Sequence, residues 1–186
     1  MDSKCILVLG GARGGKSKFA QDLASKLSEK VLFVATGQAS DDEMQERIEN
    51  HKKSRPRTWR TLEAPTAVAD KLRENLGDSD VVIIDCITML VANLLGDSEE
   101  FEKREKDVVE EVNRLIECID EFQATSIIVS NEVGLGIVPE NKLARYYRDF
   151  LGKANQLLAQ RADEVYLLVA GLPVEIKRLA YPGNFN

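Results

Sequence analysis

The sequence predicts an α/β fold with a mostly parallel central sheet flanked by helices, and three observations lead to this prediction. Short apolar runs alternate with segments of helical periodicity along the chain, which is the pattern of strands joined by crossover helices. The length of 186 residues suits one domain, and no repeat, low-complexity tract or linker divides it. The composition is 44% hydrophobic and 30% charged, as in folded globular proteins. We therefore expect a single domain over residues 1–186.

The expected strands are short apolar runs of the kind that is buried in a parallel sheet. They lie at Cys5–Leu9, Val31–Ala35, Val81–Asp85, Ser126–Ser130 and Glu164–Val169, with a short terminal strand near Val174–Lys177.

The segments between these runs have the apolar spacing of amphipathic helices. Helices are expected over Lys16–Leu27, from Asp41 behind a Ser40–Glu43 capping box, and over Thr66–Asn75, Glu99–Phe122 and Pro139–Ala162. The stretch Lys52–Pro65 is basic, contains two prolines and is expected to be irregular.

Charge and hydropathy exclude several classes of partner. The net charge of −6 provides no general basic field for nucleic acid or an anionic membrane. Every apolar stretch is far shorter than the roughly 20 residues of a membrane span, and the first residues lead into a strand instead of a signal sequence. The three cysteines, Cys5, Cys86 and Cys118, lie in apolar segments and are expected to be buried, reduced thiols. We expect a cytoplasmic protein with no nucleic-acid partner and no membrane span.

The clearest motif is a phosphate-binding loop near the N-terminus. The string Gly10-Gly11-Ala12-Arg13-Gly14-Gly15-Lys16-Ser17 matches G-x-x-x-x-G-K-[ST] in full, directly after a strand and before a helix. Its glycines let backbone N–H groups surround phosphate oxygens, and the helix N-terminus adds partial positive charge. Lys16 is expected to reach the β- and γ-phosphates, and Ser17 to bind Mg²⁺. The alternative is a glycine-rich turn without a ligand.

Asp85 ends the apolar run Val81–Asp85. This position fits a carboxylate that binds Mg²⁺ or its waters. The alternative is that Asp85 caps the N-terminus of a following helix, where Asp is also favoured.

His51 is the only histidine and falls near the end of the second expected helix. Five cations follow it closely: Lys52, Lys53, Arg55, Arg57 and Arg60. A neutral imidazole is a competent nucleophile towards phosphorus, and the cations would neutralise a triphosphate. Spacing does not decide between this hypothesis and an incidental histidine beside a solvated basic loop.

These segments together resemble the bifunctional adenosylcobinamide kinase / adenosylcobinamide-phosphate guanylyltransferases over nearly the whole chain. Besides the phosphate loop, the resemblance rests on His51-Lys52 with Arg55-Pro56 and Trp59-Arg60-Thr61, and on Asp85-Cys86-Ile87-Thr88 and Asn93-Leu94-Leu95. The most specific part is the string Ser130-Asn131-Glu132-Val133-Gly134-Leu135-Gly136-Ile137-Val138-Pro139-Glu140-Asn141, continued by Gly152-Lys153-Ala154-Asn155-Gln156. The chain departs from the family's usual pattern at Gly14, commonly Ser, and at Asp85, often Glu.

The resemblance implies a RecA-like P-loop NTPase fold, a trimer and two reactions. A nucleoside triphosphate (ATP or GTP, with Mg²⁺) phosphorylates adenosylcobinamide. GTP then guanylylates His51, and adenosylcobinamide phosphate takes the GMP to give adenosylcobinamide-GDP. The implied nucleotide contacts are Gly10, Gly11, Ala12, Arg13, Gly14, Gly15, Lys16, Ser17, Val34, Ala35, Thr36, Lys52, Lys53, Ser54, Arg55, Glu63 and Asp85.

Asn131 and Glu132 follow an apolar strand, and α/β folds bind ligands at the carboxyl ends of their strands. We expect these two residues to contact substrate or Mg²⁺-bound water. The alternative is an Asn that caps a loop and a surface Glu.

Two other classes of function fit the motifs. One is a P-loop kinase of a small metabolite that forms no covalent intermediate, with His51 incidental. The other is a nucleotide-gated interaction module, for which the Asn131–Gly134 segment and the basic loop would form a partner surface.

Overall fold

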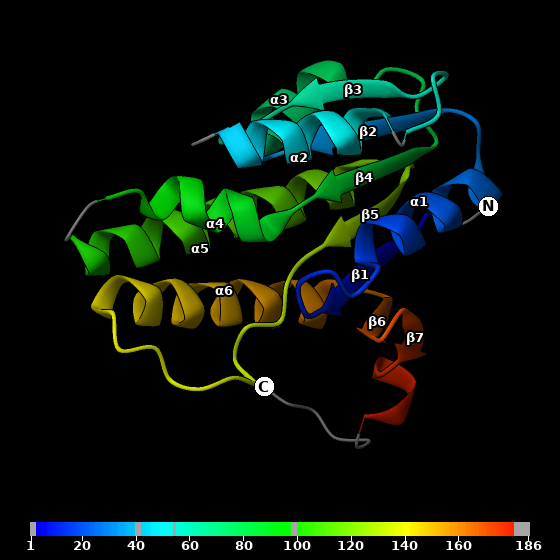
Figure 1. The fold of residues 1–186 in the computed structure, drawn as a ribbon. Coiled ribbons are helices and arrows are strands. Elements are labelled where there is room, and N and C mark those ends of the chain that lie inside the picture. Colours follow the sequence, from blue (N-terminus) through cyan, green and yellow to red (C-terminus); the bar gives the residue numbers. More distant parts are fainter. Residues whose placement is uncertain (1–2, 40–41, 54, 98–99, 181–186) are drawn as a thin grey trace.

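The computed structural model describes residues 3–39, 42–53, 55–97 and 100–180. It is an α/β structure whose strands and helices alternate along most of the chain (Figure 1). The elements are β1 (Cys5–Gly10), α1 (Lys16–Leu27), β2 (Val31–Ala35), α2 (Asp42–Lys53), β3 (Arg60–Glu63), α3 (Val68–Asn75), β4 (Val81–Asp85), α4 (Ile87–Leu95), α5 (Phe101–Glu121), β5 (Thr125–Val129), α6 (Lys142–Arg161), β6 (Glu164–Val169), β7 (Leu172–Glu175) and a final 3₁₀ turn, η1 (Lys177–Leu179).

The strands form one seven-stranded sheet in the order β3-β2-β4-β5-β1-β6-β7. Every neighbouring pair is parallel except β6 and β7, which form an antiparallel hairpin at one edge. The predicted α/β class with a mostly parallel sheet is therefore confirmed, and the architecture is that of a P-loop NTPase-like fold. A parallel sheet of this kind needs cover on both faces because its central strands are apolar on both sides.

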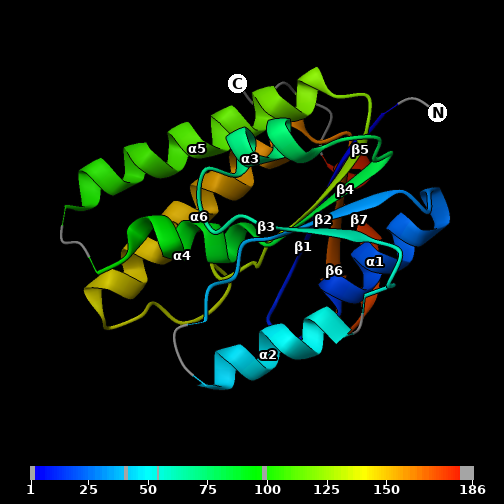
Figure 2. The same ribbon diagram turned by 90° about the horizontal axis from the view of Figure 1, so that it is seen from above.

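The two faces of the sheet are covered unequally. One face packs against α3, α4, α5 and α6, whose buried residues form one apolar cluster with alternate residues of the strands. The other face packs against α1 through Ala20 and Ala24, and buried Trp59 belongs to the same cluster. Figure 2 shows α2 (cyan) apart from the layer of α3, α5 and α6. The small alanines let α1 approach the central strands closely, and this approach places the phosphate loop above the carboxyl ends of the strands.

The register of the parallel strands brings several motif residues to one level. Glu63 pairs with Ala35, Ala35 with Asp85, and Asp85 with Val129. These residues end four adjacent strands, so they form a row along the carboxyl edge of the sheet. The row extends across one half of the sheet, from Glu63 to Val129. Because β1 pairs with β5, the phosphate loop that follows β1 lies next to the Val129 end of the row.

One strand and one α-helix of the structure were not predicted from the sequence. β3 lies inside the stretch Lys52–Pro65 that was expected to be irregular. As an edge strand it is largely exposed and carries polar residues, so it has no apolar run. Helix α4 was missed for the opposite reason. Its sequence is almost wholly apolar and it is buried on several sides, so it has no polar face to reveal a helical period.

Several predicted boundaries and one burial prediction were wrong. Helix α6 begins at Lys142 and not at Pro139, because the Asn141 side chain accepts a hydrogen bond from the Ala144 N–H at 3.1 Å and caps the helix. The terminal strand is Leu172–Glu175 because it pairs with β6 directly after the turn. All three cysteines are free, but Cys86 is only half-buried. The expected starts at Ser40–Asp41 and Glu99 lie outside the described residues.

None of the helices in the described part of the chain is both long and apolar enough to span a membrane.

Candidate functional site

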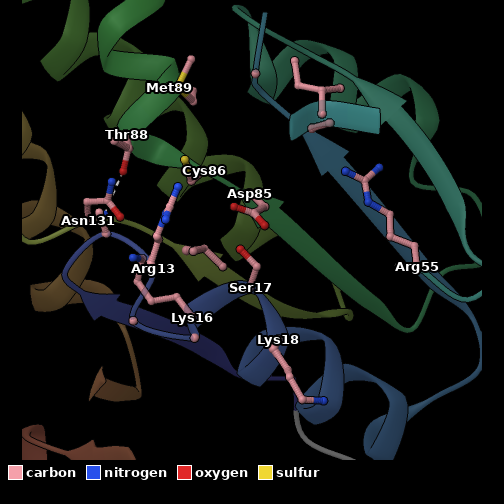
Figure 3. A pocket seen from close by; sticks show the side chains of 17 residues that line it. Arg13, Lys16, Ser17, Lys18, Arg55, Asp85, Cys86, Thr88, Met89 and Asn131 are labelled. Atoms are coloured by element: carbon pink, nitrogen blue, oxygen red, sulfur yellow. Dashed lines mark hydrogen bonds between the residues drawn. The ribbon is translucent and has the colours of Figure 1, made fainter. Parts of the chain in front are cut away.

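A cavity of about 500 Å³ lies at the carboxyl edge of the sheet (Figure 3). Its walls come from the phosphate loop, from the ends of β2, β4 and β5, from the start of α4, and from α2 and the loop after it. The lining residues are Ala12, Arg13, Gly14, Gly15, Lys16, Ser17, Lys18, Ala35, Gly37, Ile48, Arg55, Asp85, Cys86, Thr88, Met89, Val129 and Asn131. This volume is in the range of pockets that hold one small ligand.

The phosphate loop has the compact backbone that its glycines predict. The Gly14 N–H donates to the Gly11 carbonyl at 3.1 Å, and Gly15 has a φ of 88° at the N-cap of α1, where a side chain would be strained. A Cβ on Gly10 would lie 2.6 Å from the Leu168 carbonyl oxygen of β6. A Cβ on Gly14 would lie 2.9 Å from the Gly11 carbonyl oxygen, so the glycine at this position relieves a close contact.

Lys16 is the buried cation of the site. The residue is only 7% exposed, and its ammonium donates to the Gly11 carbonyl at 2.7 Å. Lys16 begins α1, so its ammonium and the backbone N–H groups of the first turn face the same cavity. A buried ammonium beside a helix N-terminus provides the positive potential that a polyphosphate needs.

Asp85 and Ser17 have the chemistry of a magnesium site. The Asp85 Oδ2 atom is buried and has no hydrogen-bond partner among the described residues, which is costly unless a ligand or ion satisfies it. Figure 3 shows the Ser17 hydroxyl pointing towards the Asp85 carboxylate across the cavity. Hard oxygen ligands of this kind suit Mg²⁺, which also retains waters and phosphate oxygens. Cys86, and not Asp85, occupies the N-cap of α4, so the capping alternative for Asp85 is wrong.

Arg55 lines the cavity from the segment that follows α2. Its guanidinium carbon lies 3.6 Å from the centroid of the Phe33 ring, an arrangement of cation–π stacking. Its Nε and Nη1 atoms are buried without a partner among the described residues. Burial lowers the pKa of Arg55, and the carboxylates of Asp85 and Glu63 partly oppose this shift. A desolvated guanidinium with unused N–H groups is well suited to an anionic ligand.

Only one of the three predicted contacts Val34, Ala35 and Thr36, at the end of β2, lines the cavity. Ala35 does so, whereas Val34 is completely buried in the core. The Thr36 hydroxyl donates to the Cys86 carbonyl at 2.6 Å and accepts from the Cys86 N–H at 2.8 Å. Thr36 therefore joins the ends of β2 and β4 beneath the cavity.

Among the described residues, the predicted contacts Lys52, Lys53 and Glu63 are not part of the cavity lining. The Lys52 ammonium is 2.5 Å from Glu63 Oε1 in a half-exposed ion pair, and this ammonium lowers the pKa of Glu63. Lys53 is exposed, and Ser54 lies outside the described residues. The ion pair links the last turn of α2 to the end of β3.

His51 belongs to the last turns of α2. Its backbone is described, whereas its side chain and those of Glu43, Met44, Arg47 and Asn50 lie outside the described part. Ile48, three residues earlier, lines the cavity, and a spacing of three residues puts two positions on one helix face.

Asn131 and Glu132 have different environments. Asn131 lines the cavity, and its N–H donates to Thr88 Oγ1 at 2.8 Å. Glu132 is not part of the lining, and its Oε1 accepts from the Gly134 N–H at 2.5 Å. The structure thus brings Asn131, but not Glu132, together with Lys16 and Asp85.

Sequence reasoning assigned no role to several residues that build this site. Thr88, Met89 and Cys86 line the cavity from the start of α4, and Asn93 and Asn155 tie neighbouring loops together. Burial, and then the Asp85 carboxylate, raise the pKa of the Cys86 thiol to about 11, so Cys86 is not a thiolate nucleophile at neutral pH. Thr88, Asn93 and Asn155 were part of the motif strings, but only the fold shows what they contact.

Comparison with known proteins agrees with this geometry. Residues 6–176 match the family described as cobinamide kinase / cobinamide phosphate guanyltransferase. The chain is 42% identical over 180 residues to the bifunctional adenosylcobalamin biosynthesis protein CobU of Escherichia coli, covering 92% of this chain and 99% of the relative. The protein of the same name from Salmonella typhimurium is 43% identical over 180 residues, with the same coverage. The bifunctional adenosylcobalamin biosynthesis protein CobP of Pseudomonas aeruginosa is 42% identical over 173 residues, covering 92% and 96% of the two chains.

Proposed function

This chain belongs to the cobinamide kinase / cobinamide phosphate guanyltransferase family, and on this premise we propose that it catalyses both reactions in one domain over residues 1–186. It phosphorylates adenosylcobinamide with ATP or GTP, and it then transfers GMP from GTP to adenosylcobinamide phosphate. The observation that carries the proposal is the convergence of Lys16, Asp85 and Arg55 on one cavity. These residues come from three separate segments of the chain.

The proposed nucleotide contacts divide according to where the residues lie. The phosphate loop from Gly10 to Ser17 and Arg55 supply donors to the phosphates, and Ala35 supplies part of the wall. Val34 and Thr36 support this wall from beneath. Lys52 and Lys53 are proposed to act near the nucleotide from the last turn of α2, and Glu63 from the end of β3. Ser54, which follows Lys53 in the sequence, is proposed to act there too.

Ser17 and Asp85 are proposed to hold Mg²⁺, partly through water. The unpartnered buried Asp85 Oδ2 supports this assignment. When bound, Mg²⁺ neutralises developing charge on the phosphate oxygens.

The kinase step is a direct transfer between two oxygens. The aminopropanol hydroxyl oxygen of adenosylcobinamide attacks the γ-phosphorus, the bond to the β–γ bridging oxygen breaks, and the nucleoside diphosphate leaves as the hydroxyl proton is released. Lys16 stabilises the charge on the β- and γ-phosphates during this step. Asp85 is proposed to contribute to the same step as a ligand of Mg²⁺. Its half-buried position in the cavity that the phosphate loop lines supports this role.

Guanylyl transfer is proposed to proceed through His51. A neutral imidazole nitrogen attacks the α-phosphorus of GTP, the bond to the α–β bridging oxygen breaks, and pyrophosphate leaves. A phosphate oxygen of adenosylcobinamide phosphate then attacks the same phosphorus, and the nitrogen–phosphorus bond breaks to restore His51. The position of His51 one turn from Ile48, which lines the cavity, supports this role.

The covalent step has a direct test. Purified protein with Mg²⁺ is incubated with GTP labelled at the α-phosphorus and analysed on a denaturing gel. We expect an acid-labile band that His51→Asn lacks, and no band when the label is on the γ-phosphorus. If the wild type binds GTP and carries no label, the covalent mechanism is wrong. Transfer of γ-phosphate to adenosylcobinamide would then separate a kinase without an intermediate from a binding module.

The proposal also includes the assembly and location that the family resemblance implies. We propose that the protein is a homo-oligomer, specifically a trimer, in the cytoplasm. Sedimentation of the purified protein tests the trimer.

A further inference from the structure

Asn131 occupies a defined place between the phosphate loop and Asp85. It follows β5, which pairs with β1 on one side and with β4 on the other. The next residue, Glu132, donates its N–H to the Gly10 carbonyl at 3.1 Å. This hydrogen bond ties the segment after β5 to the first residue of the phosphate loop.

The backbone of Asn131 is held from both sides by side chains of two helices. Its N–H donates to Thr88 Oγ1 of α4 at 2.8 Å, and its carbonyl accepts from Asn155 Nδ2 of α6 at 3.0 Å. Asn155 is 7% exposed, and its Oδ1 accepts from the Ser130 hydroxyl at 2.6 Å. Both ends of a buried amide are therefore used to hold the two residues that follow β5.

The side-chain amide of Asn131 is the part of the residue that this network leaves unused. Within the described ranges it makes no hydrogen bond, and it faces the cavity that Lys16 and Asp85 also line. Figure 3 shows Asn131 joined to Thr88 by a dashed line on the same side of the cavity as Arg13. A neutral amide held by a buried network is a preorganised donor, which is the kind of group that binds phosphate oxygens without reorganisation.

The location selects the terminal phosphate as its target. In a triphosphate on this loop, Lys16 reaches the β- and γ-phosphates. Asp85 at the end of β4 and Asn131 just after β5 line the same cavity as Lys16. We infer that the Asn131 amide binds the terminal phosphoryl group of the nucleotide, and that Asn155 and Thr88 are positioning residues that hold Asn131 in place. This inference rests on the proposed function, because it assumes that the cavity binds a nucleoside triphosphate.

The consequence is a site that distinguishes a triphosphate from a diphosphate. The amide contact exists only while the terminal phosphate is present, so phosphoryl transfer removes it and favours release of the diphosphate. In guanylyl transfer the same group becomes part of pyrophosphate, and Asn131 then stabilises the leaving group.

Binding measurements test the inference independently of turnover. We would measure the affinities of Mg²⁺–GDP and Mg²⁺–β,γ-imido-GTP by calorimetry in a His51→Asn background, which prevents guanylylation. The preference is the ratio of the affinity for the triphosphate analogue to the affinity for GDP. We expect Asn131→Ala to lower this ratio about tenfold, since one hydrogen bond to a charged group is removed. Its affinity for GDP should not change. Thr88→Val and Asn155→Asp should each lose about threefold of this preference, since each removes one hydrogen bond that holds the Asn131 backbone.

A matched control separates positioning from general destabilisation. Asn75 also donates its amide to a carbonyl, that of Lys71 at 2.8 Å, and it is absent from the cavity lining. Asn75→Asp should therefore keep the full triphosphate preference.

An unchanged preference in Asn131→Ala would overturn the assignment. A lower melting temperature with full preference in both Thr88→Val and Asn155→Asp would overturn the positioning role. A background protein that binds neither nucleotide would instead overturn the proposed function.

Discussion

The two walls of the cavity are built in different ways. The first wall consists of the phosphate loop, Asp85 and Asn131, which end adjacent parallel strands and are placed by the register of the sheet. The second wall consists of the last turns of α2 and Arg55. It is held by the half-exposed Lys52–Glu63 ion pair and by the stacking of Arg55 on Phe33.

This difference implies different sensitivities. Backbone pairing within a buried sheet does not depend on salt or on the charge of any side chain. An exposed ion pair is weakened by salt and by protonation of its carboxylate. We therefore expect the binding of phosphates, which both proposed reactions need, to be robust. The proposed guanylylation of His51 would use the second wall, so its rate should respond to ionic conditions.

The largest expected effect comes from the first wall. Lys16→Met removes the buried ammonium beside the phosphates, and removal of one such electrostatic group lowers the rate by about 10²–10³. Both the labelling of His51 by GTP and phosphoryl transfer to adenosylcobinamide should fall, as measured with α-labelled and γ-labelled nucleotide. Lys26→Met, an exposed change in the last turn of the same helix, is the control and should leave both rates unchanged. A loss of only one reaction would contradict a phosphate site common to both.

The next effect belongs to the second wall. Arg55→Lys keeps a positive charge but loses the planar group that stacks on Phe33 and offers several N–H donors. We expect the rate of His51 labelling to fall by about tenfold to a hundredfold, with a smaller change in phosphoryl transfer. Arg57→Lys is an exposed control two residues away. An equal fall in both reactions would show that Arg55 contributes to phosphate binding alone and not to guanylylation through the second wall.

The same division explains how much the sequence could reveal. The strands at Cys5–Leu9 and Val31–Ala35 were predicted closely because buried parallel strands are short apolar runs. The phosphate loop was recognisable because its glycines and Lys16 act through local geometry.

What remained hidden depends on contacts between distant segments. Asn155 reaches Asn131 across 24 positions and Asn93 reaches Thr36 across 57, and no local pattern encodes such contacts. The stretch that contains β3 looked irregular because an exposed edge strand carries no apolar run. The cation-rich segment gave no sign that Arg55 turns into the cavity while Lys52 pairs with Glu63.

Asn93 links the segments that follow β2 and β3, and its replacement should reduce stability. Its amide donates to the Thr36 carbonyl at 2.8 Å and to the Pro65 carbonyl at 2.9 Å, so it ties the end of β2 to the loop after β3. Asn93→Leu leaves both carbonyls without this donor, and we expect the free energy of unfolding to fall by about 2 kcal/mol. Urea denaturation measures the loss. Asn75→Leu is the control, because it removes an amide that bonds only within its own helix. If Asn75→Leu lowers the free energy of unfolding as much as Asn93→Leu does, the hydrogen bonds of Asn93 have no special role in stability.

The smallest effect tests the ion pair of the second wall. Glu63→Gln removes a carboxylate whose side chain is 65% exposed, so the free energy of unfolding should fall by less than about 1 kcal/mol. Lys52 lowers the pKa of Glu63 from its ordinary value of 4.5. The pair therefore contributes fully above that value, and its contribution is lost as the pH falls through the lowered pKa. The difference in stability between wild type and Glu63→Gln should accordingly disappear in acid and also shrink at high salt.

A second exposed carboxylate makes this comparison specific to the site. Glu121 pairs with Arg73 and has a side chain that is 55% exposed, and this partner lowers its pKa. Glu121→Gln should change stability with the same dependence on pH and salt, because the same physics applies. Only Glu63→Gln should also slow the labelling of His51. Glu63 pairs with Lys52, which follows His51 directly in α2. Equal labelling rates in the two variants would mean that the ion pair stabilises the fold without placing the second wall for catalysis.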